Sequence, residues 1–568
     1  MSDLSLLPLR SLPIACVMAL LTLNASAQTV PDAGSLLREN ERQQPRLPQS
    51  TPKLTPQEAA PSDPNALRVK VKAFRITGNT LIAEPVLQAA LAGWVGKETT
   101  FAELQQAANA VTEAYRAHGW FARPQLPAQD LSEGIVTITI LEGRLGAVQI
   151  DDGGITLRVD RALVTDTMTA RQKPGDPLNL DDLERGSAIL NDTPGVAVAT
   201  ILAPGKAVGE TDAIVQVQDK ALLTFTAQLD SHGARSTGAS KLTASAFLDN
   251  PTGRGDQISL NGNASEGSTY VKLGYSRPWG RDGLRLGING SAMRYHLVGD
   301  LANLNSLGDA QTYGITANYP LARSGTRNVS LAAALDVKDY ANEANQTSTS
   351  QKRVQTALVA LNGDLLDSVG AGGMTLWGIN LTAGDVDLSA NSTNQNADQA
   401  GPQTAGSYSK LGYSLARLQR LNDKATLWAS LNGQFAGKNL DSSEKFSLGG
   451  PSGVRAYPVM EGSGDDGWLL TLEARYNLSP DLQVTGFYDQ GAVTQSHNAD
   501  YTGAPLANTG TLKGVGVGVN WSQAGKWNVR AALAHRLGDN PFATVATGAD
   551  GDGSLELNRL WLSAVVYF

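Results

Sequence analysis

From residue 221 to residue 568, hydrophobic and polar side chains alternate along short segments that are separated by turn-forming residues. A period of two is typical of β-strands whose two faces meet different surroundings. Helical patterns are absent from this region, so the sequence predicts an all-β structure of about sixteen antiparallel strands. The predicted strands begin near residues 222, 241, 257, 269, 284, 312, 327, 353, 374, 408, 426, 468, 482, 512, 527 and 560.

The two faces of a predicted strand differ in chemistry. In residues 468–478, Trp468 and Tyr476 lie on an apolar face, while Glu473 and Arg475 lie on the opposite face. Lipid outside and water inside a closed sheet explain such a strand, and the alternation of short turns with long loops is typical of an outer-membrane barrel. The alternative is a soluble β-sandwich, but a sandwich needs apolar residues where these charges lie. The pattern therefore favours a membrane β-barrel.

The preceding region, from Leu67 to Gln218, has a compact α/β pattern in which one order of elements occurs twice. Each half reads strand, helix, helix, strand, strand, over about 75 residues. Such internal repetition predicts two small tandem domains. The predicted strands are 67–76, 121–126, 135–141, 145–150, 196–202 and 213–217, and the predicted helices are 85–94, 101–118, 158–169 and 179–191.

The N-terminus has the pattern of an export signal. The apolar run 12–23 is followed by Ala25, Ser26 and Ala27, which form a small-residue cleavage site. We therefore expect residues 1–27 to be a secretory signal peptide. Cys16 is the only cysteine, and a lipid-modified cysteine is the alternative there, but the apolar run before it is too short for that.

Two further segments precede the α/β region. Within residues 28–44, the stretch 31–44 predicts a short polar helix, in which only two leucines are apolar. The alternative is a frayed, solvated helix. Residues 45–65 contain six prolines, which predicts an extended linker.

Composition and charge exclude two classes of protein. Beyond the apolar run near the N-terminus, no stretch approaches the roughly 20 apolar residues of a membrane-spanning helix, so a polytopic helical membrane protein is excluded. The net charge of -8 argues against a general nucleic-acid binder. Charged residues are only 18% of the chain and glycine accounts for 59 of 568 residues, which is compatible with a large β-barrel.

A search for catalytic and metal-binding patterns is negative. The five histidines are scattered, and neither a zinc-protease helix nor a nucleophile elbow is present. The glycine-rich sequence GSGDDG at 462–467 precedes a strand rather than a helix, and its two aspartates would repel a pyrophosphate. Asp550, Asp552 and Ser554 resemble half of a calcium loop without its final glutamate. We therefore predict no catalytic residue, no metal site and no cofactor.

Two short motifs form the strongest candidate site. The first consists of Val454, Arg455, Ala456, Tyr457 and Pro458 in a long loop, and the second of Phe487, Asp489 and Gly491 on the second strand after it. Strand parity turns Asp489 into the lumen, where a carboxylate requires a cation. Arg455 on the loop could fold inward and lock the loop through a charge-assisted contact. The alternatives are a solvated Arg455 and a competing contact with Glu473, which faces the lumen by parity.

These motifs and the order of segments resemble the outer-membrane translocators of two-partner secretion, which share a superfamily with the BamA-type barrel assembly proteins. The resemblance covers essentially the whole chain. It implies a plug helix within 28–44, two POTRA domains at 66–144 and 145–219, and a sixteen-stranded barrel at 220–568. In the family, the arginine and the aspartate of the two motifs interact inside the barrel, which implies Arg455 and Asp489 here. Ala456 stands where glycine is frequent.

The resemblance also implies a function and a location. The POTRA domains would bind an unfolded secreted exoprotein, carrying an N-terminal secretion domain, in the periplasm of a Gram-negative bacterium, and the barrel would translocate it to the cell surface. Phe568 would be the C-terminal signal that the barrel assembly machinery reads before insertion among outer-membrane lipids. No nucleic acid, cofactor or enzymatic activity is implied. A BamA-like insertase and a passive porin or nutrient receptor are the alternatives.

Overall fold

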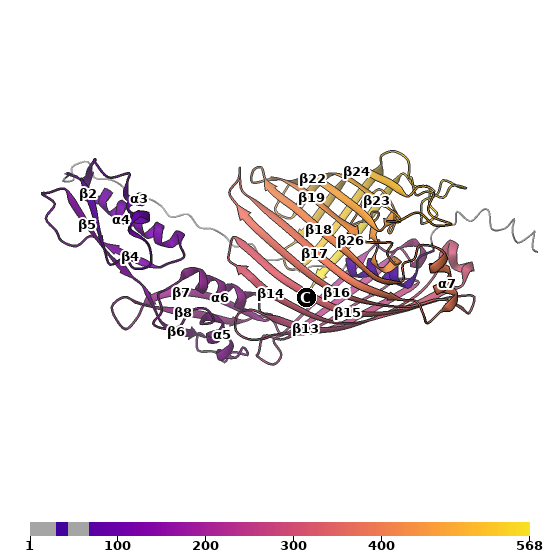
Figure 1. Ribbon diagram of the computed structural model, residues 1–568, viewed down its shortest axis with the longest axis horizontal. Coiled ribbons are helices and arrows are strands. Elements are labelled where there is room, and N and C mark those ends of the chain that lie inside the picture. The colour runs from indigo at the N-terminus through magenta and orange to yellow at the C-terminus, as the bar shows by residue number, and fades with distance from the viewer. Residues whose placement is uncertain (1–29, 44–67) are drawn as a thin grey trace, which may run out of the picture.

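A computed structural model describes residues 30–43 and 68–568 of the chain. Two small α/β units lie in series at one end of a closed β-barrel, and a short helix lies inside the barrel near its other end (Figure 1). This confirms the predicted fold class. The predicted signal peptide, residues 1–27, and the predicted Pro-rich linker, residues 45–65, both lie outside the described residues.

The first α/β unit contains a three-stranded sheet in the order β2-β5-β4, with β2 parallel and β4 antiparallel to β5. Side chains from both helices and from the sheet form one buried apolar core. The predicted strand 67–76 is divided, because its first part leaves the sheet and pairs with a short strand that the pattern did not predict. The elements are β1 (Arg68–Lys70), β2 (Ala73–Thr77), α3 (Glu84–Leu91), β3 (Glu98–Thr100), α4 (Phe101–Ala117), β4 (Ala122–Gln125) and β5 (Ile135–Glu142).

The second unit repeats this arrangement, as the internal repetition predicted. Its sheet has the order β6-β8-β7, with β6 parallel and β7 antiparallel to β8. A second, separate apolar core lies between this sheet and its helices. The elements are β6 (Arg144–Asp151), α5 (Arg161–Met168), α6 (Leu180–Asp192), β7 (Val196–Pro204) and β8 (Glu210–Asp219).

Sixteen antiparallel strands from the described part of the chain form the barrel, and β26 pairs with β9 to close it. Every strand start predicted from the sequence corresponds to one of them. The strands are β9 (Leu223–Asp230), β10 (Lys241–Asp249), β11 (Gln257–Ala264), β12 (Ser268–Pro278), β13 (Arg285–His296), β14 (Ser306–Arg323), β15 (Arg327–Ala344), β16 (Thr347–Asp367), β17 (Gly373–Asp387), β18 (Gly406–Arg420), β19 (Ala425–Ala436), β22 (Asp466–Asn477), β23 (Leu482–Thr494), β24 (Thr509–Gln523), β25 (Trp527–Arg536) and β26 (Asn558–Tyr567).

The long connections lie at the end of the barrel opposite the α/β units and contain structure of their own. They carry the helix α7 (Ser392–Ala400), the short helices η1 (Arg235–Thr237), η2 (Gly299–Leu304) and η3 (Ser442–Glu444), and the two-residue strands β20 (Phe446–Ser447) and β21 (Ser463–Gly464). The expectation that helices are absent after residue 221 is therefore wrong. The sequence of α7 is polar on every face, so no apolar stripe reveals it.

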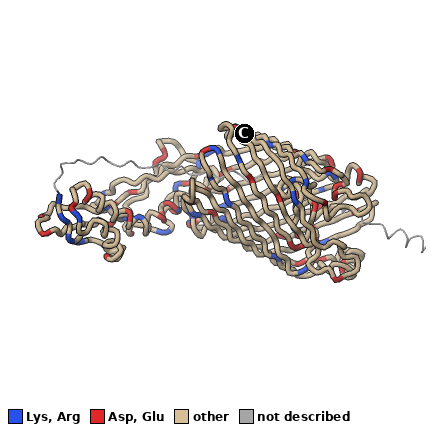
Figure 2. Tube along the Cα trace, turned by 90° about the horizontal axis from the view of Figure 1, so that it is seen from above, with Lys and Arg blue, Asp and Glu red and all other residues tan. Residues whose placement is uncertain are grey.

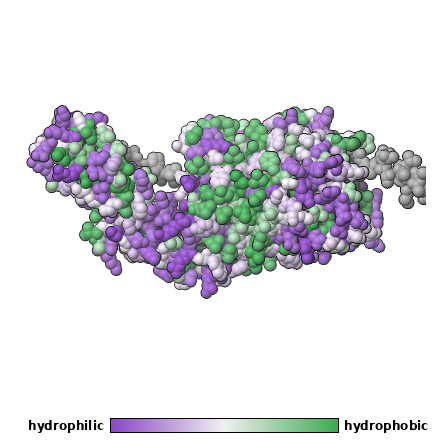
Figure 3. Space-filling model, in the orientation of Figure 1, coloured by the Kyte–Doolittle hydropathy of each residue, from purple (hydrophilic) through white to green (hydrophobic). Residues whose placement is uncertain are grey.

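The outer surface of the barrel suits lipid around its middle. Hydrophobic residues gather there in a band, and hydrophilic residues cover the end that carries the long loops (Figure 3). The band includes Leu273, Ile288, Ile315 and Leu335, which are all more than half exposed. Charged residues are frequent in the two α/β units, while most of the barrel trace carries none (Figure 2). None of the helices in residues 30–43 and 68–568 is long and apolar enough to cross a membrane.

The barrel closes where the C-terminal strand meets the first strand. Five residue pairs join β26 to β9, fewer than join any other two neighbouring strands of the barrel. The Phe568 amide donates to the Phe225 carbonyl at 2.9 Å, and their rings lie 5.6 Å apart. Backbone pairing thus continues to the last residue of the described chain, which suits a sheet that can leave no edge open in lipid.

The second α/β unit is seated on three short turns of the barrel rim. Arg185 donates to Asp282 at 2.9 Å, in the turn between β12 and β13, and Asp282 also pairs with Arg171. Arg323, at the end of β14, forms two hydrogen bonds with Asp192 of α6. The turn between β10 and β11 takes part through backbone contacts. These contacts fix one face of the unit against one side of the rim.

Candidate functional site

The first motif lies inside the barrel. Between β19 and β22 the chain folds inward, and the side chains of Val454, Ala456 and Tyr457 have no exposed surface. They join Leu448 and residues of the barrel wall in one apolar cluster. Burial of three neighbouring side chains fixes the conformation of the loop tip, so the residue between two of them, Arg455, has a defined position.

Arg455 and Asp489 form a two-pronged ion pair. The Nε and Nη2 atoms of Arg455 donate to the two carboxylate oxygens of Asp489 at 2.7 and 2.8 Å. The backbone amide of Arg455 donates to the same carboxylate at 3.2 Å. Asp489 is completely buried, and charge-assisted pairs with this geometry are the strong ones. The structure thus brings together the two residues that the sequence paired.

Glu473 shares the arginine instead of competing for it. Nη1 of Arg455 donates to Glu473 at 2.8 Å, while Arg475 binds the other oxygen of Glu473 through two hydrogen bonds. Burial alone would lower the pKa of Arg455, but the hydrogen bond and the charge of Asp489 outweigh burial and raise it. The guanidinium therefore stays charged and holds carboxylates on two neighbouring strands.

Aromatic and glycine residues create the space for this contact. The guanidinium carbon of Arg455 lies 3.5 Å from the ring centre of Phe487, a close cation–π contact. On the next strand, a side chain at Gly516 would collide with that ring, and one at Gly514 would lie 2.7 Å from the Cβ atom of Ala456. The glycines of β24 therefore leave room for the loop tip. Ala456 has a negative φ, so its methyl group causes no backbone strain.

The remaining motif residues lie around this centre. Pro458 follows Tyr457 and borders the lumen cavity, and the position of Gly491 allows Leu448 to approach the barrel wall. Phe568 lies far from the loop, at the closing seam. The sequence-predicted residues thus form one buried site, apart from Phe568.

Contacts from the last strands also hold the loop, and the sequence patterns did not reveal them. Trp561 of β26 donates through Nε1 to the Arg455 carbonyl at 2.7 Å. The guanidinium of Arg536 lies over the ring of Tyr457 at 4.5 Å and pairs with Asp550. The parity of Trp561 on its strand is the only sequence signal that could have placed it in the lumen.

The half calcium loop is an ion-pair cluster. Arg559 pairs with Asp550 at 2.9 Å and with Asp552 at 3.0 Å, so cations of the protein neutralise these carboxylates. Among residues 30–43 and 68–568, no group of three metal-binding side chains could hold a metal ion. The carboxylates of this loop therefore stabilise the loop end of the barrel through ion pairs.

The short helix α2 (Ala33–Arg42) lies within the lumen, as the indigo ribbon in Figure 1. Asp32 caps it and accepts hydrogen bonds from Lys352 of β16 at 2.9 Å and from Ser442 at 2.6 Å. Burial would raise the pKa of Asp32, but the charge of Lys352 outweighs this and holds the pKa below its usual range. Leu36 and Leu37 are buried against the barrel wall, so the alternative of a frayed, solvated helix is wrong.

The other end of the helix contacts the inward-folded loop. Arg42 donates to the carbonyls of Ser447 at 3.1 Å and Ser452 at 2.8 Å. Arg38 donates to the Ser442 carbonyl at 3.0 Å. The sequence did not reveal these partners, because they lie more than 400 positions away along the chain. Helix and loop therefore fill the lumen as one assembly, beside a cavity of about 1550 Å³ toward the surface loops.

Comparisons with known proteins identify the family. The model of the "Haemolysin secretion/activation protein ShlB/FhaC/HecB" family matches residues 209–521, and the model of the ShlB-type POTRA domain matches residues 69–143. The heme/hemopexin transporter protein HuxB of Haemophilus influenzae (strain 86-028NP) is 27% identical over 528 residues, which cover 90% of this chain and 92% of HuxB.

A further relative and one solved structure match over most of their length. The outer membrane transporter CdiB of Dickeya dadantii is 28% identical over 468 residues, covering 79% of this chain and 80% of the relative. The solved structure of CdiB from Escherichia coli superimposes with a TM-score of 0.68 at 20% identity, over 94% of this chain and 96% of that one. The latter likeness shows the fold. With the family match over more than half of the chain, these findings show that the chain belongs to the haemolysin secretion/activation family of outer-membrane, two-partner secretion transporters.

Proposed function

We propose that the chain exports one unfolded partner exoprotein through its barrel to the cell surface. The observation that carries this proposal is a closed barrel whose lumen holds a short helix that is attached to the wall by side-chain contacts and not by backbone pairing. Polar contacts can be exchanged for contacts with a passing polypeptide, whereas a wall strand cannot leave without opening the sheet. The chain acts as a transporter and not as an enzyme.

The periplasmic units supply the binding surface in this proposal. The outer strand β7 of the second unit pairs with β8 on one side only, and β4 has the same place in the first unit. An unfolded chain can add to such an edge as a further strand, with backbone hydrogen bonds for affinity and side-chain contacts for selection. The N-terminal secretion domain of the partner is the segment that binds there. Folding of the partner outside the cell then favours onward movement.

The Arg455–Asp489 pair keeps the inward-folded loop in place during this cycle. Arg455→Ala should reduce export while the barrel remains inserted, because the buried carboxylate of Asp489 loses its cation and Glu473 loses one of its two. Arg475→Ala is the matched control, since Arg475 touches Glu473 but not the loop. Normal export by Arg455→Ala would show that the pair is dispensable.

A comparison of cells with and without the chain tests the proposed function. Quantitative proteomics of the outer membrane and of the culture medium should show loss of one exoprotein and no general loss of barrel proteins. A general loss would favour a BamA-like insertase, and no change in any exported protein would favour a passive pore. A chain that lacks residues 68–219 should still insert but should no longer export.

A further inference from the structure

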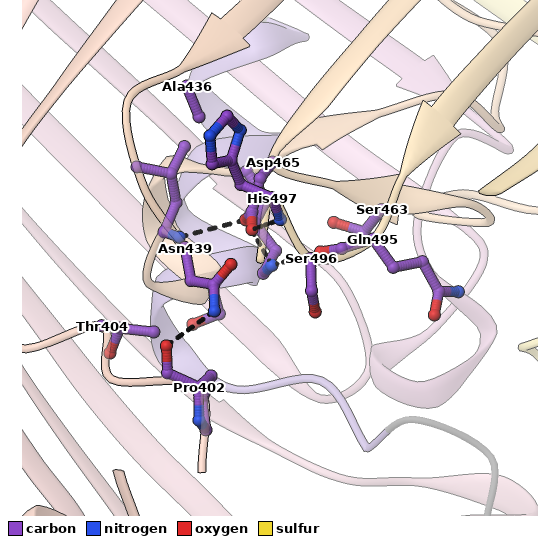
Figure 4. Close-up of polar contacts among 12 residues, drawn as sticks. Pro402, Thr404, Ala436, Asn439, Ser463, Asp465, Gln495, Ser496 and His497 are labelled. Carbon is purple, nitrogen blue, oxygen red and sulfur yellow. Dashed lines mark hydrogen bonds and ion pairs between the residues drawn. The ribbon is translucent and has the colours of Figure 1, made fainter. Parts of the chain in front are cut away.

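Asp465 lies in the glycine-rich sequence 462–467, directly before β22, and it is completely buried (Figure 4). Its carboxylate accepts hydrogen bonds from the backbone amides of Leu440 at 3.1 Å and His497 at 2.8 Å. It also accepts one from the ammonium group of Lys445. Three donors from two loops thus converge on one carboxylate, which explains this aspartate without any phosphate ligand.

Two of these donors lie at the two ends of one short segment. Leu440 begins and Lys445 ends the segment 440–445, which contains the helix η3. The ammonium group of Lys445 also donates to the carbonyl of Gln495 at 2.7 Å. A single carboxylate therefore fixes both ends of the segment, and it fixes them to the neighbouring loop between β23 and β24.

The segment 440–445 is the seat of the plug helix α2. Ser442 donates to Asp32 at 2.6 Å, and Arg38 donates to the carbonyls of Ser442 and Lys445. Asp441 shares Lys352 with Asp32. Each of these contacts requires the segment to keep its present position, so the hold on its ends is also a hold on the helix.

A neighbouring residue, Asn439, joins the segment to two further loops at the surface opening. Asn439, next to Leu440, donates to the carbonyls of Pro402 and Asn498 at 2.7 and 2.8 Å, and it accepts the amide of Asn498 at 2.7 Å (Figure 4). Pro402 belongs to the connection between β17 and β18. Contacts of Asp465 and Asn439 thus connect three surface loops to the segment that seats the helix.

We propose that Asp465 is a positioning residue that keeps the plug helix seated and the surface loops closed while the pore is at rest. Its carboxylate does not contact a transported polypeptide, and it acts on the helix through the segment 440–445. The inference rests on the proposed function only in that the lumen is the transport path.

Accessibility of the helix tests the proposal. Leu37 of the helix is 1% exposed, and a Leu37→Cys reporter would be the only cysteine outside the predicted signal peptide. Asp465→Asn replaces one acceptor oxygen by an amide group that can only donate, at a point where three donors already converge. The variant therefore loosens the segment 440–445. We expect it to raise the rate of maleimide labelling of the reporter about tenfold in full-length chains inserted in the outer membrane, the factor given by about 1.4 kcal/mol. Open-channel conductance in planar bilayers should rise with it.

Asp466→Asn is the matched control. Asp466 accepts from the Ala436 amide and from His497, both at 2.7 to 2.8 Å, but it does not touch the segment 440–445. It should leave labelling at the reference rate. Equal labelling of both variants, or unchanged labelling in a correctly inserted Asp465→Asn barrel, would overturn the proposal.

Lys445→Gln is a second variant in case Asp465→Asn fails to insert. It removes the cation of the pair, so it should also raise labelling, and the double variant should label no faster than the stronger single variant. If the two substitutions multiplied each other's effect on the labelling rate, they would not act through the single contact between Asp465 and Lys445. Labelling reports the position of the helix and not export, so the proposed function can fail while this inference stands, and the reverse.

Discussion

At the scale of single residues, Arg455 uses the fork geometry of the guanidinium group. Two of its nitrogen atoms contact Asp489, a third contacts Glu473, and the flat face lies over Phe487. A lysine has one charged nitrogen and no flat face, so it can reproduce at most part of this arrangement. The geometry of the group, in addition to its charge, therefore holds the loop.

Arg455→Lys should export much less of the partner exoprotein than the unchanged chain. The variant keeps the charge but loses the two-pronged pair and the ring contact, so we expect a loop destabilised by about 1.5–3 kcal/mol. Immunoblotting of the exoprotein in the medium, normalised to inserted barrel, measures the effect. Arg475→Lys should have a smaller effect, and equal export by both variants would contradict the argument.

Glu461 gives the loop a dependence on pH. Burial is the main cause that raises the pKa of its carboxyl to about 7, and Asp550 and Asp552 add to this. A raised folded-state pKa means that the folded state binds the proton more tightly. Stability from this group is thus fully present below about pH 4.5, its ordinary pKa, and is lost as the pH rises through about 7.

Glu461→Gln should therefore flatten the pH dependence of thermal unfolding between about pH 5 and 8. The amide carries no charge at any pH in this range, while it keeps an acceptor for Asn540. Circular dichroism melting of the detergent-solubilised protein at several pH values gives the comparison. A variant whose melting temperature falls with pH as steeply as that of the unchanged chain would assign the dependence to another group.

The site was predictable where a local pattern fixed the direction of a side chain. Strand parity placed Asp489 and Glu473 in the lumen, and the motif resemblance paired Arg455 with Asp489. The partners of the helix were not predictable in this way. Lys352 lies 320 positions from Asp32, and no local pattern encodes which of many lumen side chains a segment so distant in sequence will meet.

At the scale of elements, the plug helix combines a small apolar contact with charged ends. Leu36 and Leu37 are buried in a cluster with tyrosines of the barrel wall, while Asp32 and Arg42 bind lumen groups at the two ends. Burial of two leucines contributes about 3–6 kcal/mol at most, before the entropy of ordering is subtracted. The polar ends therefore decide much of the helix's retention.

Asp32 variants separate the cap from the ion pair. Asp32→Asn keeps a good N-cap but loses the charge that faces Lys352, whereas Asp32→Ala loses both. Channel recordings in planar bilayers should show more open time for Asp32→Asn and still more for Asp32→Ala, with about 1 kcal/mol between them from the cap. Glu41→Gln, also on the helix, should match the unchanged chain. The opposite order of the two Asp32 variants would exclude a role of the cap.

Elements were predictable from the sequence to the extent that they bury or expose one regular face. The sixteen barrel strands and four POTRA helices have such faces, and their positions were predicted. The ends of strands were less predictable than their positions. β14 begins at Ser306 and β16 begins at Thr347, each six residues before the predicted start. There, backbone pairing continues into water, where neither face has to be apolar.

At the scale of the whole molecule, Asp282 connects the periplasmic units to the barrel. It accepts hydrogen bonds from Arg171 and Arg185, and the hydroxyl of Tyr319 donates to it at 2.5 Å. Although burial raises the pKa of Asp282, these donors outweigh it and lower the pKa. One carboxylate of a short turn thus gathers three of the groups that join the second unit to the rim.

Asp282→Ala should widen the range of orientations of the second POTRA unit. Arg185 is nearly buried and would lose its carboxylate, but the Asp282 side chain is 32% exposed, so the cost stays below the about 3–5 kcal/mol of a fully buried pair. Spin labels on α5 and on a barrel turn, measured by pulsed electron resonance, should give a broader distance distribution. Asp300→Ala is a control at the opposite end, where an exposed pair with Arg235 contributes little. A distribution as narrow as that of the unchanged chain would mean that Arg323 and Asp192 suffice.

The three turns that seat the second POTRA unit all belong to the first half of the barrel. The entrance is therefore asymmetric, because the contacts that the described residues of the second unit make with the rim lie along one side. A polypeptide that is released from the second POTRA unit would enter at an angle, close to the barrel wall. It would therefore reach the helix α2 and the inward-folded loop from one side. The seating of the second POTRA unit thus sets the direction from which a polypeptide enters the barrel, and this direction contributes to selectivity.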